Sequence, residues 1–96
     1  MKTTKELIEL LNLKPLEKNI FSGDSITIGS KIVFGGQVLA QAVNAAYRTI
    51  NEDRFLHSLH SYFLEAGDLK VPISYDVAEM RNGGSFSTRR VTASQN

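Results

Sequence analysis

The sequence predicts an α+β fold in which one long helix is wrapped by a curved antiparallel sheet. Residues 36–50 read as a helix whose polar side chains are confined to a narrow stripe, which is typical of a helix buried on most of its circumference. The residues after it read as strands separated by turn signals. We therefore expect the order helix, strand, buried helix and antiparallel meander.

The composition is that of one small globular domain. The chain has 96 residues, of which 42% are hydrophobic and 22% charged, and its formal net charge is +1. Such a length suits a single domain. The small net charge gives no strong field to attract nucleic acid or an anionic membrane, so we expect neither as a partner.

Cysteine is absent from the chain, which excludes disulfides, thiolate zinc sites and a cysteine nucleophile. The N-terminus has no apolar signal core, and no apolar run is long enough to span a membrane. We expect a cytoplasmic protein that uses no metal and no other cofactor.

The N-terminal residues predict a short amphipathic helix. Thr3 and Glu6 match a capping box, and the helix ends near Asn12. Its apolar residues follow at helical spacing: Leu7, Ile8, Leu10 and Leu11. Residues 19–22 then predict a short strand before the Gly23-Asp24 turn signal. Further extended segments are predicted around Ile26, Ile28 and residues 32–34.

The long helix begins at Gly35-Gly36. Its polar stripe is about 60° wide, because these residues recur at nearly the same angle around the axis. The stripe consists of Gln37, Gln41, Asn44 and Arg48. Two interpretations are equally open: the stripe lines a cleft, or it is simply the hydrated edge of the helix.

Three segments after the helix are predicted to be strands: residues 55–65, 73–80 and 85–94. In the second segment Ile73, Tyr75 and Val77 alternate with polar or small residues, as in a half-buried strand. The Asn82-Gly83 pair that follows is a strong hairpin signal.

The last predicted strand is followed by no closing element, and an unprotected strand edge is a liability. We expect residues 1–96 to form one incomplete domain, with residues 1–15 as a short leading helix. The domain is then a piece of a longer protein, or it is completed by another chain.

Two histidines, His57 and His60, lie in the first predicted strand. They are expected on opposite faces, because side chains alternate along a strand. Both faces carry bulky apolar groups, which predicts a strand covered on both sides. His60 is the candidate for proton chemistry, as a base or as a group that orients water. The alternative is a histidine that fixes strand packing. No acidic or thiol partner lies at ligand spacing, so we expect no metal site.

Several motifs share an order and spacing with a known family. The first are Val33-Phe34-Gly35-Gly36-Gln37-Val38 with Gln41-Ala42, then His57-Ser58-Leu59-His60-Ser61-Tyr62-Phe63-Leu64 with Gly67-Asp68. The others are Pro72-Ile73, Tyr75-Asp76-Val77, Arg81, Gly83, Ser85-Phe86, Arg89-Arg90-Val91 and Gln95. Together they resemble the N-terminal half of the acyl-CoA thioesterase II family, from about residue 16 to residue 96.

The resemblance implies the hotdog fold, a curved antiparallel sheet around one long helix. It implies that the full protein consists of two fused hotdogs and hydrolyses fatty acyl-CoA to a free fatty acid and CoA with activated water. The catalytic Asp, a hydroxyl residue and a Gln would lie in the second hotdog, and His60 would occupy the position of that Asp in this half. We expect residues 1–96 to supply scaffold and part of the substrate cleft, and to be inactive alone. The implied partners are acyl-CoA and either the second hotdog or another copy of the chain, as in a homo-oligomer.

Six residues are candidates for contact with this substrate: Gly35, Gly36, Gln37, Gln41, Tyr62 and Arg89. The backbone N–H groups at Gly35-Gly36 would hold a thioester oxyanion or a phosphate, or the glycines merely let the chain enter the helix. Tyr62 shares a predicted strand face with His60. Arg89 suits a CoA phosphate, with a solvated or salt-bridged arginine as the alternative.

Two other functions are open at this stage. One is another hotdog activity on acyl thioesters, a hydratase or dehydratase. Many of those enzymes place an acidic residue on the central helix, and residues 35–50 contain none. The other is a non-catalytic pairing module, which the absent second half favours.

Overall fold

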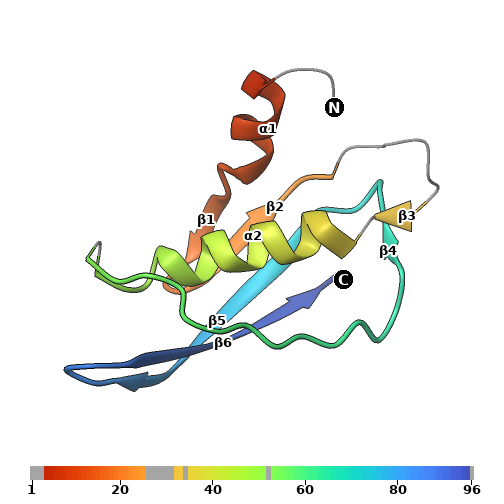
Figure 1. Cartoon of the computed structure of the whole chain (residues 1–96). Coiled ribbons are helices and arrows are strands. Elements are labelled where there is room, and N and C mark those ends of the chain that lie inside the picture. Colours follow the sequence, from red (N-terminus) through yellow and green to blue (C-terminus); the bar gives the residue numbers. More distant parts are fainter. Residues whose placement is uncertain (1–3, 26–31, 34, 52, 96) are drawn as a thin grey trace.

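A computed structural model describes residues 4–25, 32–33, 35–51 and 53–95. A four-stranded antiparallel sheet has the order β1-β2-β5-β6, and the long helix α2 lies against it (Figure 1). Two very short strands, β3 and β4, pair separately. The elements are α1 (Thr4–Leu11), β1 (Lys14–Glu17), β2 (Ile20–Gly23), β3 (Ile32–Val33), α2 (Gly35–Tyr47), β4 (Gly67–Asp68), β5 (Ile73–Asn82) and β6 (Ser87–Ser94).

The hairpin of β5 and β6 confirms the second and third predicted strands. Ile73, Tyr75 and Val77 are all buried, so the apolar face of β5 forms the centre of the core, as the alternation predicted. The strands pair in antiparallel register, with Val77 opposite Val91, and the register shifts between Glu79 and residue 81. The core is completed from β2, α2 and the α1–β1 connection by Phe21, Ala45 and Leu13.

The N-terminal helix is confirmed as α1, and the predicted strand over residues 19–22 is confirmed as β2. Strand β1 was not predicted, because Pro15 lies within it. Proline is tolerated there since β1 pairs only with β2 and forms an edge of the sheet. The predictions made for Thr3, Ile26 and Ile28 lie outside the described residues.

Helix α2 is confirmed, but of the two interpretations of its polar stripe the hydrated edge is wrong for Gln37 and Gln41. Its buried residues are Gln37, Gln41 and Ala45, whereas Ala40 and Tyr47 are exposed. The two glutamines of the stripe therefore face the sheet and do not form a hydrated edge, whereas Arg48 of the same stripe is exposed. The reason is that both amides find hydrogen-bond partners inside the protein, which removes the cost of burying them.

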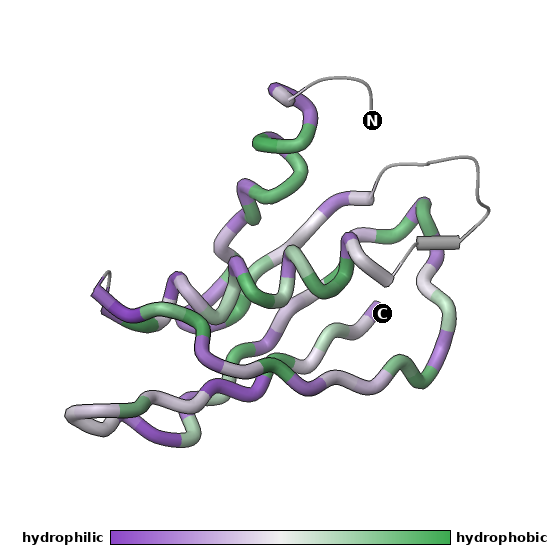
Figure 2. Tube along the Cα trace, viewed as in Figure 1, coloured by the Kyte–Doolittle hydropathy of each residue, from purple (hydrophilic) through white to green (hydrophobic). Residues whose placement is uncertain are grey.

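The prediction of a covered strand over residues 55–65 is also wrong. This segment is extended but forms no strand, and Phe55, Tyr62 and Leu64 are 88%, 92% and 90% exposed. Within the described residues no neighbouring strand supplies the hydrogen bonds that a ladder requires. Green stretches on the tube in Figure 2 mark the apolar residues of this segment. Among the described residues neither helix has the length and apolar character needed to cross a membrane.

Candidate functional site

A buried polar network joins α2 to the sheet. The Tyr75 hydroxyl donates to Gln41 Oε1 at 2.5 Å, and both side chains have no exposed surface. Gln41 Nε2 in turn donates to the carbonyl oxygens of Leu10 at 3.0 Å and Asp24 at 2.8 Å. Burial raises the pKa of Tyr75 well above its usual range, so the phenol stays protonated and acts as a donor.

The other glutamine of the stripe also bonds within the protein. Gln37 is 2% exposed, and its Nε2 donates to Ser25 Oγ at 2.9 Å. Gln37 and Gln41 thus hold the consecutive residues Asp24 and Ser25, where the chain leaves β2. The structure brings these two predicted site residues together, at the interface between helix and sheet.

The N-terminus of α2 is close to an aromatic side chain. A Cβ atom added at Gly35 would lie 3.2 Å from Cζ of Phe63, so glycine lets the ring approach the first turn. Gly36 is exposed. The first N–H groups of a helix have no partner within the helix, which suits them to a negatively charged oxygen.

The two histidines do not form a pair. His57 contacts the ring of Phe86 edge to face, with 6.1 Å between centroids. His60 and Tyr62 are exposed on the extended segment that follows α2. In the part of the chain that the structure describes, no group of three or more His, Asp or Glu is placed to hold a metal ion.

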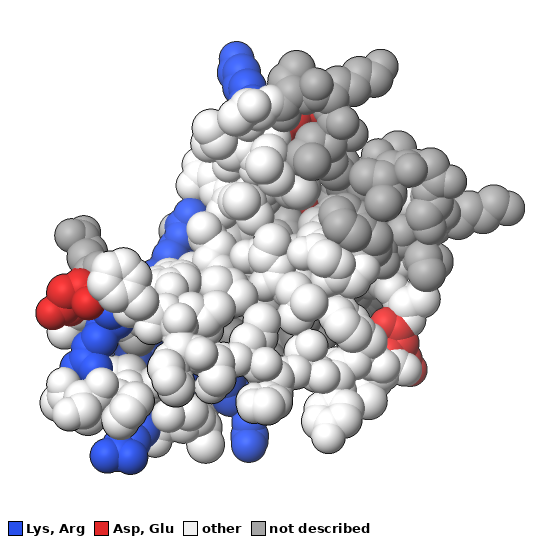
Figure 3. Space-filling view, in the orientation of Figure 1, with Lys and Arg blue, Asp and Glu red and all other residues white. Residues whose placement is uncertain are grey.

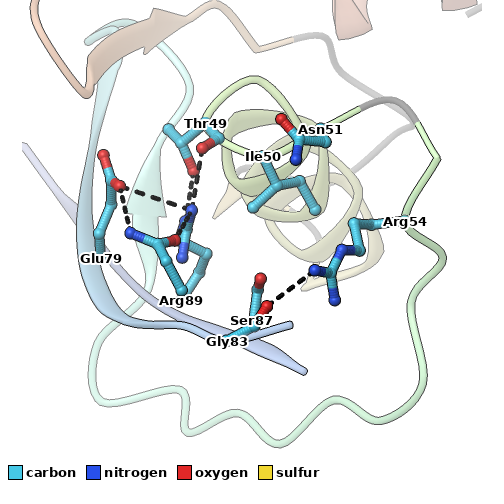
Figure 4. A pocket seen from close by; sticks show the side chains of 9 residues that line it. Thr49, Ile50, Asn51, Arg54, Glu79, Gly83, Ser87 and Arg89 are labelled. Atoms are coloured by element: carbon cyan, nitrogen blue, oxygen red, sulfur yellow. Dashed lines mark hydrogen bonds and ion pairs between the residues drawn. The ribbon is translucent and has the colours of Figure 1, made fainter. Parts of the chain in front are cut away.

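Arg89 links the C-terminal end of α2 to the hairpin of β5 and β6 (Figure 4). Its Nε donates to Thr49 Oγ1 at 2.7 Å and its Nη2 to Thr49 O at 2.9 Å. Nη2 also donates to Asn82 Oδ1 at 2.6 Å, and Nη1 to Arg81 O at 3.0 Å. Nη2 lies 3.5 Å from Glu79 Oε1, and the arginine side chain is only 7% exposed. The structure therefore places Arg89 in a network of internal bonds.

A polar pocket of about 310 Å³ opens beside Arg89. It is lined by Thr49, Ile50, Asn51, Arg54, Glu79, Asn82, Gly83, Ser87 and Arg89. Figure 3 shows Lys and Arg side chains gathered at this end of the molecule. The pocket itself contains a carboxylate. Hydrogen bonds from Asn19 and Asn82, and then the charge of Arg89, hold the pKa of Glu79 below its usual range. A carboxylate at this place weakens the attraction of the pocket for a phosphate.

The sequence did not predict the roles that some residues have in these networks. Tyr75 was identified as a core position and as a motif residue, and its place among alternating apolar residues gave no sign of a polar partner. Arg54 donates through Nη2 to Gly83 O at 2.8 Å and to Gly84 O at 3.0 Å. Gln95, identified from the sequence only as a motif residue, accepts from the N–H of Asp68 and donates to its C=O, so its amide pairs with both backbone groups of that residue as an opposing strand residue would.

Comparison with known proteins adds the following similarities. Residues 22–96 match the family model described as the acyl-CoA thioesterase N-terminal domain. "Acyl-CoA thioesterase 2" of Haemophilus influenzae is 51% identical over 89 residues, which are 93% of this chain and 31% of that protein. "Acyl-coenzyme A thioesterase 8" of Homo sapiens is 46% identical over 86 residues, 90% of this chain and 27% of that protein. The chain thus spans less than a third of the length of these relatives.

Two solved structures are similar over nearly the whole chain. A tesB protein of Mycobacterium avium subs paratuberculosis superposes with a TM-score of 0.90 at 35% identity, covering 98% of this chain and 38% of that one. The acyl-CoA thioesterase II TesB2 of Mycobacterium marinum gives 0.82 at 42% identity, with 94% and 32% covered. The predicted α+β hotdog architecture is thereby confirmed.

Proposed function

Because the chain belongs to the acyl-CoA thioesterase N-terminal domain family, we propose that the full-length protein hydrolyses fatty acyl-CoA to a free fatty acid and CoA. The observation that carries this proposal is the match over residues 22–96, together with 51% identity to a protein named as an acyl-CoA thioesterase. This activity belongs to fatty acid metabolism. Water, activated by groups of the protein, is the nucleophile.

In this proposal residues 1–96 are the N-terminal hotdog and supply scaffold and part of the substrate cleft. The contacts of the described side chains favour an auxiliary role for residues 1–96 over a complete reaction centre. Gln37 and Gln41 are committed to internal hydrogen bonds, and Arg89 is held by Thr49 and Asn82. The feature best suited to the substrate is the N-terminus of α2, where backbone donors would stabilise a developing oxyanion.

His60 and Tyr62 contribute to the cleft in this proposal, His60 as a group that supports the chemistry of the second half. Both are exposed on the segment after α2, where a second surface has access to them. A supporting imidazole near neutral pH can orient or exchange a proton with water.

The partner that we propose for this surface is a second hotdog domain, with another copy of the chain as the alternative. The segment over residues 55–64 is extended, exposes large apolar side chains and forms no strand. Unpaired extended backbone next to exposed apolar groups favours association with another element. We also propose that the protein is cytoplasmic.

The test compares the full-length protein with residues 1–96 alone, both purified and supplied with a fatty acyl-CoA. Release of the CoA thiol by the full-length protein, and none above background by residues 1–96, is the expected result. Failure of the full-length protein to release thiol would refute the thioesterase proposal and favour the pairing module. Robust release by residues 1–96 alone would refute the division of roles between the two halves.

A hydratase or dehydratase is less well supported. Helix α2 extends over Gly35–Tyr47 and carries no Asp or Glu, so it lacks the acidic residue that many hotdog enzymes of that kind place there. Incubation with an enoyl-CoA in the same experiment separates the two activities, because hydration leaves the thioester intact.

A further inference from the structure

The connection between β5 and β6 contains a reactive pair of residues that the proposed function does not use. Asn82 ends β5, and Gly83 begins the turn. Glycine has no Cβ to hinder its own backbone nitrogen, so this nitrogen reaches a preceding asparagine side chain more easily than that of any other residue. From the contacts around this pair we propose that Asn82 is a site of spontaneous deamidation, and that Arg89 activates its amide.

The reaction requires only water and a solvent base. The deprotonated backbone nitrogen of Gly83 attacks Cγ of Asn82, and a new C–N bond closes a succinimide ring. The bond from Cγ to Nδ2 breaks, and the nitrogen leaves with a proton from solvent as ammonia. Water then opens the ring at one of its two carbonyls, which yields aspartate or isoaspartate. Nothing is oxidised or reduced.

The fold requires both members of the susceptible pair. A Cβ added at Gly83 would lie 2.7 Å from the backbone oxygen of Phe86 and 3.1 Å from Arg81 Nε, so any other residue would displace the turn. Asn82 both accepts from Arg89 and donates through Nδ2 to Glu79 Oε1 at 3.2 Å. No carboxylate can make both contacts, because an ionised carboxylate only accepts. The reactive pair is thus built into the hairpin.

The contact with Arg89 favours the first step. Its Nη2 lies 2.6 Å from Asn82 Oδ1, the oxygen on which negative charge develops when the nitrogen attacks. Bonds to Thr49 fix the guanidinium in place beforehand, so stabilising this charge costs little reorganisation. Asn82 is exposed, which admits water. Two contacts oppose the reaction. The Glu79 carboxylate accepts from Asn82 Nδ2 at 3.2 Å, and its charge disfavours a negative oxygen nearby. The Gly83 N–H donates to Phe86 O at 2.8 Å and must open first.

Opening of that contact is a local event. Residues 84–86 at the tip are exposed, and such turns open at a small fraction of the free energy of global unfolding. After the reaction a carboxylate at position 82 would face Glu79 without the amide donor between them. The two carboxylates would compete for Arg89 and weaken its hold on Thr49, at the C-terminal end of α2.

The experiment incubates the full-length protein in mildly alkaline buffer and maps its peptides by mass spectrometry over time. Asn19 is the internal control, since its Nδ2 also donates to Glu79, at 2.6 Å, but the β-branched Ile20 follows it. We expect Asn82 to convert while Asn19 keeps its amide. The proposal is overturned if Asn82 stays intact for a period in which a synthetic peptide of residues 80–86 converts completely.

Two variants test the role of Arg89. In Arg89→Gln the rate at Asn82 is expected to fall by about threefold to tenfold, less than the loss of a donor in a buried oxyanion hole because this site is exposed. Arg54→Gln is the matched control, since the Arg54 guanidinium donates to the carbonyl oxygens of Gly83 and Gly84 rather than to Asn82 Oδ1, and the rate at Asn82 is expected to be unchanged or higher in this variant. If Arg89→Gln fails to fold, Arg89→Lys is the test variant. Its deamidation rate at Asn82 is expected to lie between the rate of the unaltered protein and the rate expected for Arg89→Gln. An unchanged or raised rate in the Arg89 variant, or an equal fall in Arg54→Gln, overturns the activation.

Discussion

Removing the hydroxyl group of Tyr75 tests whether the polar network under α2 stabilises the domain. Tyr75 is fully buried, and its hydroxyl donates to Gln41 Oε1 at 2.5 Å. Tyr75→Phe keeps the aromatic ring, so it removes this bond without opening a large cavity. Gln41 Oε1 is then buried without its donor, which costs about 1–3 kcal/mol of unfolding free energy.

The partner substitution gives a second magnitude. Gln41→Leu removes the donors to the carbonyl oxygens of Leu10 and Asp24 and leaves the Tyr75 hydroxyl without its acceptor. With several buried polar groups affected, we expect a loss of about 2–4 kcal/mol. The double variant should be less destabilised than the sum of the single variants, by about 0.5–3 kcal/mol, because the two groups are in direct contact.

The measurement is the urea dependence of unfolding for the full-length protein, with hydrogen exchange at β5 amides to assign the transition to this domain. Thr88→Val is the control, since Thr88 is exposed on β6, outside the proposed interface, and the removal of its hydroxyl should change stability by less than about 0.5 kcal/mol. A Tyr75→Phe variant as stable as Thr88→Val would refute the reasoning. Strict additivity of Tyr75→Phe and Gln41→Leu would also contradict it.

Three further outcomes are expected. Arg89→Met should lower the unfolding free energy by about 2–4 kcal/mol, measured by urea denaturation, because several backbone and side-chain acceptors lose a nearly buried donor. Because the folded-state pKa of Glu79 is lowered, its contribution to stability is present above the ordinary carboxyl pKa and is lost as the pH falls through the folded-state value. Glu79→Gln should therefore make the thermal midpoint depend less on acid pH. An unchanged dependence would exclude this contribution. Gly23→Ala should destabilise by about 1–3 kcal/mol because its Cβ would lie 2.7 Å from Gln41 Oε1. Gly84→Ala, which meets nothing within 4 Å, is the matched control.

The elements that bury one face could be predicted from the sequence, because the alternation of their apolar and polar residues reflects that burial. The alternation of Ile73, Tyr75 and Val77 gave β5 and its inner face, and the Asn82-Gly83 pair gave the hairpin to β6. Both follow from local chemistry, since period-two burial and turn residues act within a few positions. The motif order over residues 33–95 gave the family, which the match over residues 22–96 confirms.

The segment over residues 55–65 shows the limit of such prediction. Its composition is that of a strand, yet a strand is defined by hydrogen bonds to a neighbour, which sequence alone does not supply. Its backbone finds a side chain instead, where the Leu56 N–H donates to the Tyr47 hydroxyl at 2.6 Å. The rings of Phe55 and Tyr62 are exposed to solvent, and large exposed apolar groups of this kind are typical of a segment that packs against another surface.

The interpretation of the polar stripe of α2 as a hydrated edge failed for a different reason. Counting polar residues around a helix identifies the buried side only if polar groups remain hydrated. Gln37 and Gln41 break that assumption, because Ser25, Tyr75 and the carbonyl oxygens of Leu10 and Asp24 replace water as their partners. Those partners come from distant parts of the sequence and become visible only when the fold is known.

The buried amides also determine which side of α2 is left for another surface. Hydrogen bonds are directional, so Gln37 and Gln41 fix the rotation of the helix about its axis more strictly than apolar packing would. With Gln37 and Gln41 held against the sheet, a neighbouring flank of the helix turns outward and exposes Ala40 and Tyr47. The exposed segment over residues 55–64 is joined to the ends of this helix, through the Tyr47 hydroxyl at one end and Phe63 beside Gly35 at the other. An apolar helix flank and an unpaired extended segment on the same side are the physical grounds for proposing that a second hotdog covers both.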